Sequence, residues 1–528
     1  MKKKFFVTTP IYYASGNIHI GHAYCSVLAD TMARYKKLCG YEVYFLTGAD
    51  EHGQKIAEKA KSNGLTPQQY VDEIADNFKL NWKALHIEYD QFIRTSSEKH
   101  MKCVQEVFER LLKQGDIYKS NYDGWYCTPC ESFWTDIQVG EEHLCPDCHR
   151  EVHRDQEESY FFNVKKYVPQ LLKFYEEHPN FVPGGKLEEM INTFIKPGLE
   201  DLCITRTSFD WGVPVKSDPK HVVYVWIDAL LNYISALGFL SPEDELFKEY
   251  WSSETEILQY AGREINRFHT IYWPILLFAL NLRLPDTVYI HGLLLTRSGV
   301  KLSKSLGNAP SPLPIIDRYS VDAIRYYDVA EVKVGDDGLF SPNQFIDRTN
   351  ADLVNNYGNL VNRTIGMMQK YRNYIVPDHH EDKMEVTKVA RAKIKEHIKN
   401  YVEAFDAYDI TKAMFEVCRI GDVANKYIDE TTPWILAKDE SKHEELDEVL
   451  YTICDACRYM SIMFKPVLVT KADKALDALS IPVEDRTINN LYTDSYMNNK
   501  TLVQCDPLFP RLKRDEENSY LVELIDGK

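Results

Sequence analysis

Two histidines near the start of the chain have the type and spacing that suit phosphate binding. His19 and His22 flank Ile20-Gly21, directly before an apolar periodic run that predicts a helix. Unpaired N–H groups and the positive end of the helix dipole make such a helix start a site for phosphate. Gly21 permits close approach of the backbone, and imidazoles separated by two residues can both face a polyphosphate. Taken alone, the pattern also fits an ordinary loop and helix start.

A second basic pair lies about 280 residues later, in the run Lys301-Leu302-Ser303-Lys304-Ser305. Gly299 precedes this run and Gly307 follows it, which predicts a loop. Two ammonium groups three residues apart on a loop can meet a pyrophosphate group. The lysine loop is therefore the candidate partner of the two histidines.

Four cysteines form two Cys-x-x-Cys pairs that are separated by fourteen residues. The pairs are Cys127 with Cys130, and Cys145 with Cys148. This spacing can place four thiolates tetrahedrally around one Zn²⁺. Because four sulfurs leave no open coordination position, we expect one structural zinc per chain, around which the small polar segment folds.

The two basic motifs together resemble those of the class I aminoacyl-tRNA synthetases. His19-Ile20-Gly21-His22 is the family's H-I-G-H motif, and the lysine run is a near match to K-M-S-K-S, with Leu302 in place of Met. The surrounding residues narrow the resemblance to the methionyl-tRNA synthetases, over nearly the whole chain. The resemblance implies a methionine–tRNA ligase that uses Mg²⁺ with ATP, makes methionyl-adenylate with release of pyrophosphate, and transfers methionine to tRNA.

The resemblance assigns ATP binding to residues at both ends of the nucleotide fold. These residues are His19, Gly21, His22, Arg263, Glu264, Lys301, Ser303 and Lys304. The expected catalytic residues are His19, His22, Lys301, Lys304 and Arg206. Arg206 aligns with a family arginine near the reacting phosphate, where a fixed guanidinium stabilises developing charge.

The resemblance also implies a methionine pocket made by residues from three parts of the chain. They are Pro10, Ile11, Tyr13, Asp50, Trp226, Ala229, Leu230, Tyr233, Ile265 and His269. The carboxylate of Asp50 suits the methionine ammonium group, and aromatic edges suit a polarizable thioether. Exclusion of a shorter apolar amino acid yields only ~1–3 kcal/mol per methylene, so a Tyr or His near the sulfur would sharpen selection.

The element pattern predicts an α/β fold. We expect a doubly wound parallel sheet of the Rossmann type, split by a zinc-binding insert and followed by an α-helical bundle. Strands are predicted at residues 5–9, 42–46, 221–226 and 288–290, and a helix at 23–39. The predicted domains are the first catalytic half at 1–115, the insert at 116–215, the second catalytic half at 216–295, the lysine loop and stem-contact region at 296–350, and the anticodon-binding domain at 351–528.

A further helix is predicted after residue 95. Thr95 and Glu98 have the spacing of a capping box, and apolar residues from Met101 to Leu112 fall on one helical face. Gly115 predicts its end.

Three residues of the bundle carry the resemblance to an anticodon-reading surface, namely Asn359, Arg363 and Trp434. An amide, a guanidinium and an indole can bond to and stack on the splayed bases of a CAU loop. The chain ends at Lys528 without the oligonucleotide-binding domain that some family members append, so we expect a monomer without a C-terminal dimerisation domain.

Composition is that of a soluble globular protein of several domains. The chain has 528 residues, 44% apolar and 27% charged. No apolar run approaches the ~18 residues of a membrane span, and the start lacks a signal-peptide pattern, so we expect a cytoplasmic protein without a membrane partner. The net charge of −17 opposes nucleic-acid binding on average but permits a local basic track.

Other functions fit parts of the pattern. A cysteinyl-tRNA synthetase combines the same motifs with zinc, but it uses an open metal site, which four cysteine ligands argue against. Arg263 and Glu264 stand where the family usually has Lys and Asp, and residues 308–312 also depart from its pattern. These departures leave open a non-catalytic RNA-binding or regulatory protein, or a divergent second synthetase with altered inhibitor sensitivity.

Overall fold

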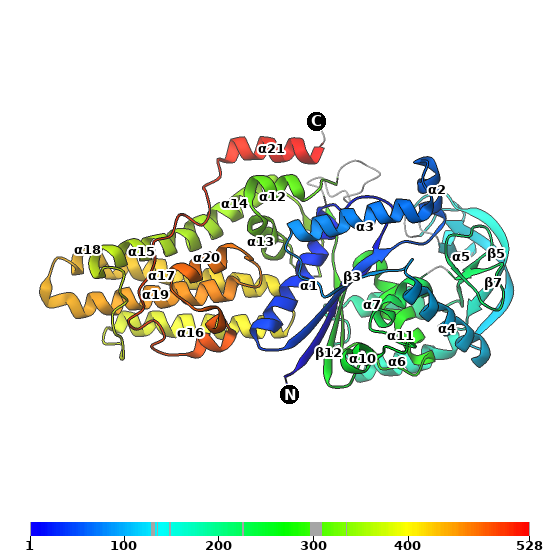
Figure 1. Ribbon diagram of the computed structural model, residues 1–528, viewed down its shortest axis with the longest axis horizontal. Coiled ribbons are helices and arrows are strands. Elements are labelled where there is room, and N and C mark those ends of the chain that lie inside the picture. The colour runs from blue at the N-terminus through cyan, green and yellow to red at the C-terminus, as the bar shows by residue number, and fades with distance from the viewer. Residues whose placement is uncertain are drawn as a thin grey trace.

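A parallel β-sheet lies at the centre of the molecule (Figure 1). The computed structural model describes residues 2–127, 132–134, 136–146, 149–223, 226–295, 309–333 and 335–526. Within these residues the sheet runs in the order β13-β12-β1-β3, with β4 and the short β2 also paired to β3. All pairs are parallel. The strands are β1 (Lys4–Thr8), β2 (Tyr12–Tyr13), β3 (Glu42–Asp50), β4 (Gln91–Arg94), β12 (Thr255–Gly262) and β13 (Thr287–His291).

The strand order reverses between β1 and β12. From β1 the chain adds β3 and then β4 on one side, whereas β12 and β13 lie on the other side. In open parallel sheets, ligands bind in the crevice outside the carboxyl ends of the two strands at such a reversal. The prediction of an α/β domain with a parallel sheet is confirmed, and the topology points to the carboxyl ends of β1 and β12 as the site.

Side chains of the central strand alternate between two apolar cores. Phe5 and Val7 belong to the core that continues through α1 (Ile20–Leu38) into the helical bundle. Phe6 belongs to the core on the opposite face, which the insert helps to cover. This alternation follows from the two-residue period of a strand and buries both faces of the sheet.

Helices connect the strands and cover both faces of the sheet. They include α1, α2 (Gln54–Ser62), α3 (Pro67–Ala84), α4 (Glu98–Gln114), α10 (Glu245–Tyr250) and α11 (Trp273–Ala279). Gly115 caps the end of α4 at φ +78°, as predicted. The predicted capping box is wrong, because Ser97 is the N-cap and the Thr95 hydroxyl instead accepts a hydrogen bond from the Glu51 N–H at 2.9 Å.

An antiparallel insert interrupts the sheet after α4. Its strands are β5 (Ile117–Cys127), β6 (Ser132–Trp134), β7 (His153–Phe162) and β8 (Leu202–Cys203), with helices α5 (Asp136–Val139), α6 (Val168–Glu177) and α7 (Lys186–Met190). A smaller sheet follows, from β9 (Thr205–Arg206), β10 (Val213–Pro214) and β11 (Val222–Val223). The short helices α8 (Ile227–Leu230) and α9 (Asn232–Ser235) then return the chain to the main sheet.

The carboxyl-terminal third is helical, as predicted, and forms one end of the elongated molecule (Figure 1). Between the sheet and the bundle lie β14 (Leu294–Leu295), α12 (Leu313–Tyr319), α13 (Val321–Glu331) and β15 (Gly338–Leu339). One continuous helical segment joins α14 (Pro342–Arg348), the π-helix η6 (Thr349–Gly358) and α15 (Asn359–Arg372). It crosses residue 351, where we predict a domain boundary. The other helices are α16 (Glu385–Asp406), α17 (Ile410–Thr431), α18 (Pro433–Leu436), α19 (His443–Phe464), α20 (Lys471–Ala478) and α21 (Arg514–Asp526).

A buried ion pair joins the catalytic half to the part that leads into the bundle. The Arg325 guanidinium on α13 lies 2.6 Å from the Asp30 carboxylate on α1, and both side chains are fully buried. The same helix α1 begins with the two predicted phosphate-binding histidines. In the residues that the structure describes, we find no helix whose length and hydropathy would let it span a bilayer.

Candidate active site

The two histidines of the first motif cap helix α1. His19 is the N-cap, and its Nδ1 accepts a hydrogen bond from the Gly21 N–H at 3.1 Å. The Nδ1 of His22 accepts in turn from the His19 N–H at 3.3 Å, so the two side chains form a reciprocal capping box. Because each Nδ1 accepts a hydrogen bond from a backbone N–H, the neutral form of each ring carries its proton on Nε2. The ring centroids lie 3.7 Å apart, which places the two Nε2 donors on one small surface at the helix start.

Gly21 has little free space for a side chain beside the His19 ring. A Cβ atom at residue 21 would lie 3.1 Å from both Cε1 and Nδ1 of His19. A Cβ there would therefore make the His19 ring move by a few tenths of an ångström. In the structure Gly21 leaves room for the imidazole that caps the helix, and its predicted contact with ATP stays a prediction.

The lysine loop, with Lys301, Ser303 and Lys304, lies outside the described residues. Both of its flanks, however, contact α1, the helix that His19 caps. The Pro310 carbonyl accepts a hydrogen bond from the Ile20 N–H at 3.1 Å, and β14 packs beside α1. The chain thus leaves the lysine loop next to the start of α1, and β14, which precedes the loop, contacts the same helix.

The end of β12 forms the opposite wall of the crevice. Arg263 and Glu264 begin the 3₁₀ turn η3 (Arg263–Ile265), directly after Gly262. The Glu264 carboxylate folds back so closely that a Cβ on Gly262 would lie 2.6 Å from its Oε2. Arg263 forms an ion pair with Asp337 at 3.2 Å. Both residues stand at the strand reversal between β1 and β12, and their contacts with ATP stay predictions.

Tyr233 and His269, two residues of the predicted methionine pocket, are hydrogen-bonded to each other in the buried interior. The Tyr233 hydroxyl lies 2.7 Å from His269 Nε2, and His269 Nδ1 lies 3.0 Å from the Ile265 carbonyl. Because a carbonyl can only accept, Nδ1 carries the proton and Nε2 accepts from the Tyr233 O–H. Burial lowers the pKa of His269 to about 4, so the imidazole is neutral near pH 7. This neutral pair suits a site for an uncharged thioether.

Aromatic stacking shapes the rim of the same region. The Trp226 ring stacks on Phe268 with centroids 3.6 Å apart and an interplanar angle of 13°. The Trp226 backbone has φ +70°, which is rare for a residue with a side chain. Of the predicted pocket residues, one apolar cluster includes Ile11, Trp226, Leu230, Tyr233 and Ile265. The structure therefore brings together residues from three distant parts of the sequence.

Three further predicted pocket residues lie at the carboxyl ends of β1 and β3. Pro10 follows β1, and Tyr13 is the partner of Asp50 in the β2–β3 pair. The Ala14 N–H donates to the Asp50 carbonyl at 2.8 Å. Asp50 and Tyr13 are both half-buried at this edge, whereas Ala229 is buried on α8.

Sequence reasoning missed a buried carboxylate behind this pocket. Asp228, on α8, contacts His52 Nδ1 at 2.6 Å and His100 Nε2 at 2.8 Å. A signal was present, since Asp228 interrupts an otherwise apolar helical run next to three predicted pocket positions. The positions of His52 and His100, 48 residues apart in the sequence, offered no such signal.

Arg206 lies at the boundary with the insert. Its side chain is 2% exposed, lies over the Tyr126 ring and forms ion pairs with Asp155 and Glu157, both at 3.2 Å. These partners belong to β5 and β7 rather than to the carboxyl end of β1. Its action on the reacting phosphate therefore stays a prediction.

Two of the four predicted zinc ligands are described. Cys127 and Cys145 are both fully buried and belong to one small apolar cluster with Trp134, Val139 and Val152. Cys130 and Cys148 lie outside the described residues. In the part of the chain that the structure describes, no group of three or more His, Cys, Asp or Glu side chains is placed to hold a metal ion.

The predicted anticodon residues lie together at the far end of the bundle. Asn359 and Arg363 are exposed on successive turns of α15, and Trp434 on α18 is 42% exposed. Arg363 lies 3.6 Å from Asp429, near the end of α17 and shortly before Trp434. Figure 1 shows α15 and α18 at the end of the bundle distant from the sheet.

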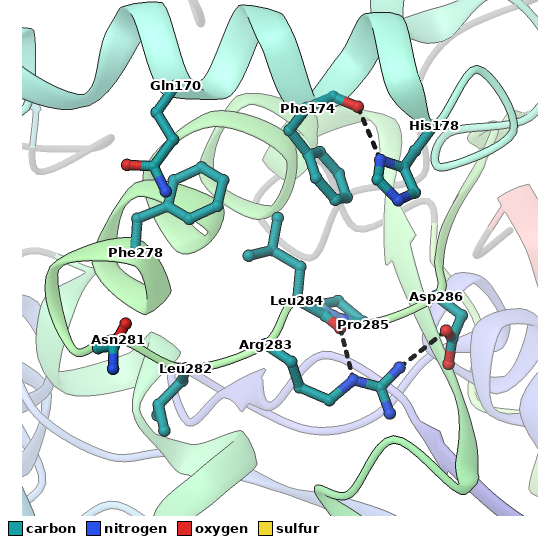
Figure 2. A pocket seen from close by; sticks show the side chains of 10 residues that line it. All are labelled: Gln170, Phe174, His178, Phe278, Asn281, Leu282, Arg283, Leu284, Pro285 and Asp286. Atoms are coloured by element: carbon teal, nitrogen blue, oxygen red, sulfur yellow. Dashed lines mark hydrogen bonds and ion pairs between the residues drawn. The ribbon is translucent and has the colours of Figure 1, made fainter.

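A surface depression of about 530 Å³ lies away from all of these residues. Figure 2 shows its lining between α6 and the segment that precedes β13. His178 stacks on Phe174 at 4.2 Å, and Arg283 pairs with Asp286 at 2.7 Å. Because Asp286 directly precedes β13, the depression lies at the amino ends of the strands, opposite the crevice. It is therefore not a candidate active site, and its residues can serve as controls for substitutions at the carboxyl ends of the strands.

Comparison with known proteins identifies the family. The model for class I tRNA synthetases (M) matches residues 5–158 and 150–365, and the model for the anticodon binding domain of methionyl tRNA ligase matches residues 376–523. The methionine–tRNA ligase of Halalkalibacterium halodurans is 47% identical over 100% of this chain and 81% of its own length. That of Caldanaerobacter subterraneus is 46% identical over 100% of this chain and 82% of its own.

A solved structure has the same fold. The Mycobacterium tuberculosis methionyl-tRNA synthetase in complex with methionyl-adenylate matches with a TM-score of 0.91 and 35% identity, over 97% of this chain and 100% of its own. The resemblance to the methionyl enzymes is therefore confirmed, in preference to the cysteinyl alternative. The chain belongs to the methionyl-tRNA synthetase family of class I aminoacyl-tRNA synthetases.

Proposed function

We propose that this chain ligates methionine to its tRNA through a methionyl-adenylate intermediate. The observation that carries this function is the 47% identity to a methionine–tRNA ligase over the whole chain. In the first step a methionine carboxylate oxygen attacks the α-phosphorus of ATP, and the bond to pyrophosphate breaks. In the second step a ribose hydroxyl at the end of tRNA attacks the adenylate carbonyl, and AMP leaves. Neither step requires a covalent enzyme intermediate, so positioning and charge stabilisation carry the catalysis.

At the ATP end, His19 and His22 donate from Nε2 to the phosphates above the start of α1. Support comes from the Nδ1 contacts of both rings, which leave the proton on Nε2 in the neutral form. Lys301 and Lys304 support the departing pyrophosphate. This assignment is supported by the contact of Pro310 with Ile20, which brings the loop flank to the same helix start. Mg²⁺ enters as the ATP complex and neutralises phosphate charge.

At the methionine end, Asp50 receives the ammonium group and the buried aromatic residues receive the thioether. The Tyr233–His269 pair supports this role, because it is neutral and held in one tautomer by the Ile265 carbonyl. Ile11, Trp226 and the other predicted pocket residues supply apolar walls. The carboxylate to be activated would then face the crevice between β1 and β12.

The bundle would bind the anticodon loop. Exposed Asn359, Arg363 and Trp434 offer an amide, a guanidinium and an aromatic face at one end of the molecule. These groups suit stacking on and hydrogen bonding to unpaired bases. We assign this role to the domain of residues 351–528, and catalysis to the halves at 1–115 and 216–295 together with the lysine loop of the region 296–350.

The donor set of the insert fits a structural zinc. Cys127 and Cys145 come from different Cys-x-x-Cys pairs, yet both lie buried in the same small apolar cluster. Cys127, Cys130, Cys145 and Cys148 would hold the ion, which when bound would crosslink a segment that has little apolar core of its own. Metal analysis should find about one zinc per chain, with most of it lost in Cys145→Ser. Cys454→Ser, at a buried thiol of α19, is the matched control. Retention of full zinc by Cys145→Ser would contradict the assignment.

Amino-acid-dependent ATP–pyrophosphate exchange tests the function directly. We expect exchange with methionine and little with cysteine or leucine, followed by charging of a tRNA with a CAU anticodon. Exchange with cysteine or leucine but not methionine would overturn the specificity. Absence of exchange with all twenty amino acids would instead favour a regulatory RNA-binding protein.

A further inference from the structure

A buried carboxylate behind the methionine pocket connects three segments that are distant in sequence. Asp228 is 2% exposed, and each of its oxygens faces one imidazole. Oδ2 lies 2.6 Å from His52 Nδ1, and Oδ1 lies 2.8 Å from His100 Nε2. His52 and His100 are 2% and 0% exposed. The group therefore joins the end of β3, helix α4 and helix α8 inside the protein.

The directions of the hydrogen bonds are determined by the chemistry of the partners. A carboxylate accepts, so His52 donates from Nδ1 and His100 donates from Nε2. In its neutral form His100 then accepts at Nδ1 from the Ser235 hydroxyl, 2.7 Å away on α9. Charge-assisted bonds of this kind are short and directional, and rupture of one leaves a buried charge without its partner. The network therefore holds α4, α8 and α9 in one register.

Both ends of this network lie next to predicted methionine contacts. His52 is two residues after Asp50, and Asp228 precedes Ala229 and Leu230. Asp228 is also two residues after Trp226, whose backbone is held at φ +70°. A non-glycine residue persists in that conformation only where the surrounding structure determines it. Asp228 is the nearest charged side chain on α8 to Trp226, which is the N-cap of that helix.

We propose that Asp228, His52 and His100 are positioning residues for methionine, which set the distance between the Asp50 carboxylate and the apolar pocket on α8. The proposal rests on the proposed function, because it assumes that methionine binds between these two elements. None of the three side chains needs to touch the substrate. They act through Asp50 on one side and through Trp226, Ala229 and Leu230 on the other.

The ATP end provides an internal reference for the test. His19 and His22 are held by the start of α1, through contacts that do not involve the network. A shift of Asp50 relative to α8 should therefore weaken the binding of methionine and leave the binding of ATP unchanged. In Asp228→Asn we expect the KM for methionine in ATP–pyrophosphate exchange to rise about tenfold or more, with the KM for ATP changed less than about twofold.

Two further variants and a control separate positioning from general destabilisation. His52→Gln should raise the KM for methionine nearly as much as Asp228→Asn, and His100→Gln should raise it about threefold, because His100 lies farther from Asp50 in the network. The control is Asp455→Asn, which removes a buried carboxylate paired with Arg458 at 2.6 Å within the bundle. It should lower the thermal midpoint and leave both KM values unchanged.

The outcomes distinguish this inference from the proposed function. Wild-type protein without methionine-dependent exchange would refute the function itself. Active wild-type protein with an unchanged methionine KM in Asp228→Asn and His52→Gln would overturn the positioning role. An equal rise in Asp455→Asn would also overturn it, since the effect would then follow from loss of stability. Should Asp228→Asn fail to fold, the two histidine variants carry the test.

Discussion

The two ends of the crevice are built in opposite ways. The proposed ATP end includes His19 and His22, three residues apart, half-exposed and hydrogen-bonded to the backbone of their own helix start. The proposed methionine end draws residues from the segment after β1 and from β3, α8, α9, η3 and the π-turn η4 (Phe268–Tyr272). Its Tyr233 and His269 are buried and hydrogen-bonded to each other. The difference teaches that a phosphate site can be made by local backbone geometry, whereas an amino-acid pocket requires long-range packing.

Loss of one imidazole at the ATP end should have the largest effect. We expect His22→Ala to lower kcat of ATP–pyrophosphate exchange about 100-fold, because it removes a fixed donor to charge that develops on the phosphates. The KM for methionine should stay within a factor of about two. His178→Ala, in the depression at the opposite edge of the sheet, is the control and should behave like wild type. A large rise in methionine KM in His22→Ala would show that the two ends are not independent.

Acid pH should lower the stability of the folded protein through the buried His269 of the methionine end. Burial lowers the pKa of His269 to about 4, below its ordinary value of 6.5. Between these values the unfolded chain binds a proton that the folded protein does not. The contribution of this group to stability is therefore complete above pH 6.5 and is lost as the pH falls toward 4, by at most about 3 kcal/mol.

Urea unfolding midpoints measured from pH 4.5 to 7.5 test this contribution. The slope of stability against pH below 6.5 should be smaller in His269→Asn than in wild type. Equal slopes in the two proteins would contradict the pKa shift and the neutral pocket that depends on it.

Removal of one hydroxyl should weaken the methionine end alone. Tyr233→Phe leaves His269 Nε2 buried without its donor, so we expect the KM for methionine to rise about tenfold. Tyr357→Phe removes a buried hydroxyl that bonds Ser461 at 2.8 Å in the bundle, and it should not change that KM. An unchanged KM in both variants would show that the hydroxyl is structural only.

A methyl group at the helix start should have the smallest effect. In Gly21→Ala the new Cβ lies 3.1 Å from the His19 ring, which must move by a few tenths of an ångström. We expect kcat of exchange to fall severalfold, by about 1 kcal/mol of transition-state stabilisation, with the methionine KM unchanged. Gly366→Ala, at an exposed turn of α15 where a Cβ meets nothing within 4 Å, is the matched control.

Local sequence signals predicted the strands of the sheet better than the N-cap of helix α4. Residues 5–9 and 42–46 formed parallel strands close to the predicted bounds, because apolar β-branched and aromatic residues occur there in short runs. The capping box at Thr95 was wrong, although its spacing was right. The Thr95 hydroxyl bonds to Glu51 of a neighbouring strand end, and a contact across 44 residues leaves no local pattern.

By itself the sequence determined the family, the general architecture and the local geometry at the start of α1. A histidine N-cap, a glycine and a second histidine in one helical turn form the reciprocal capping box through hydrogen bonds within that turn. The tertiary structure alone decided the tautomer and charge of His269, the burial of Asp228 between two imidazoles, and the location of Arg206 beside the insert. The physical reason is that pKa and hydrogen-bond direction depend on which distant groups share a dry interior, and chain spacing does not encode that proximity.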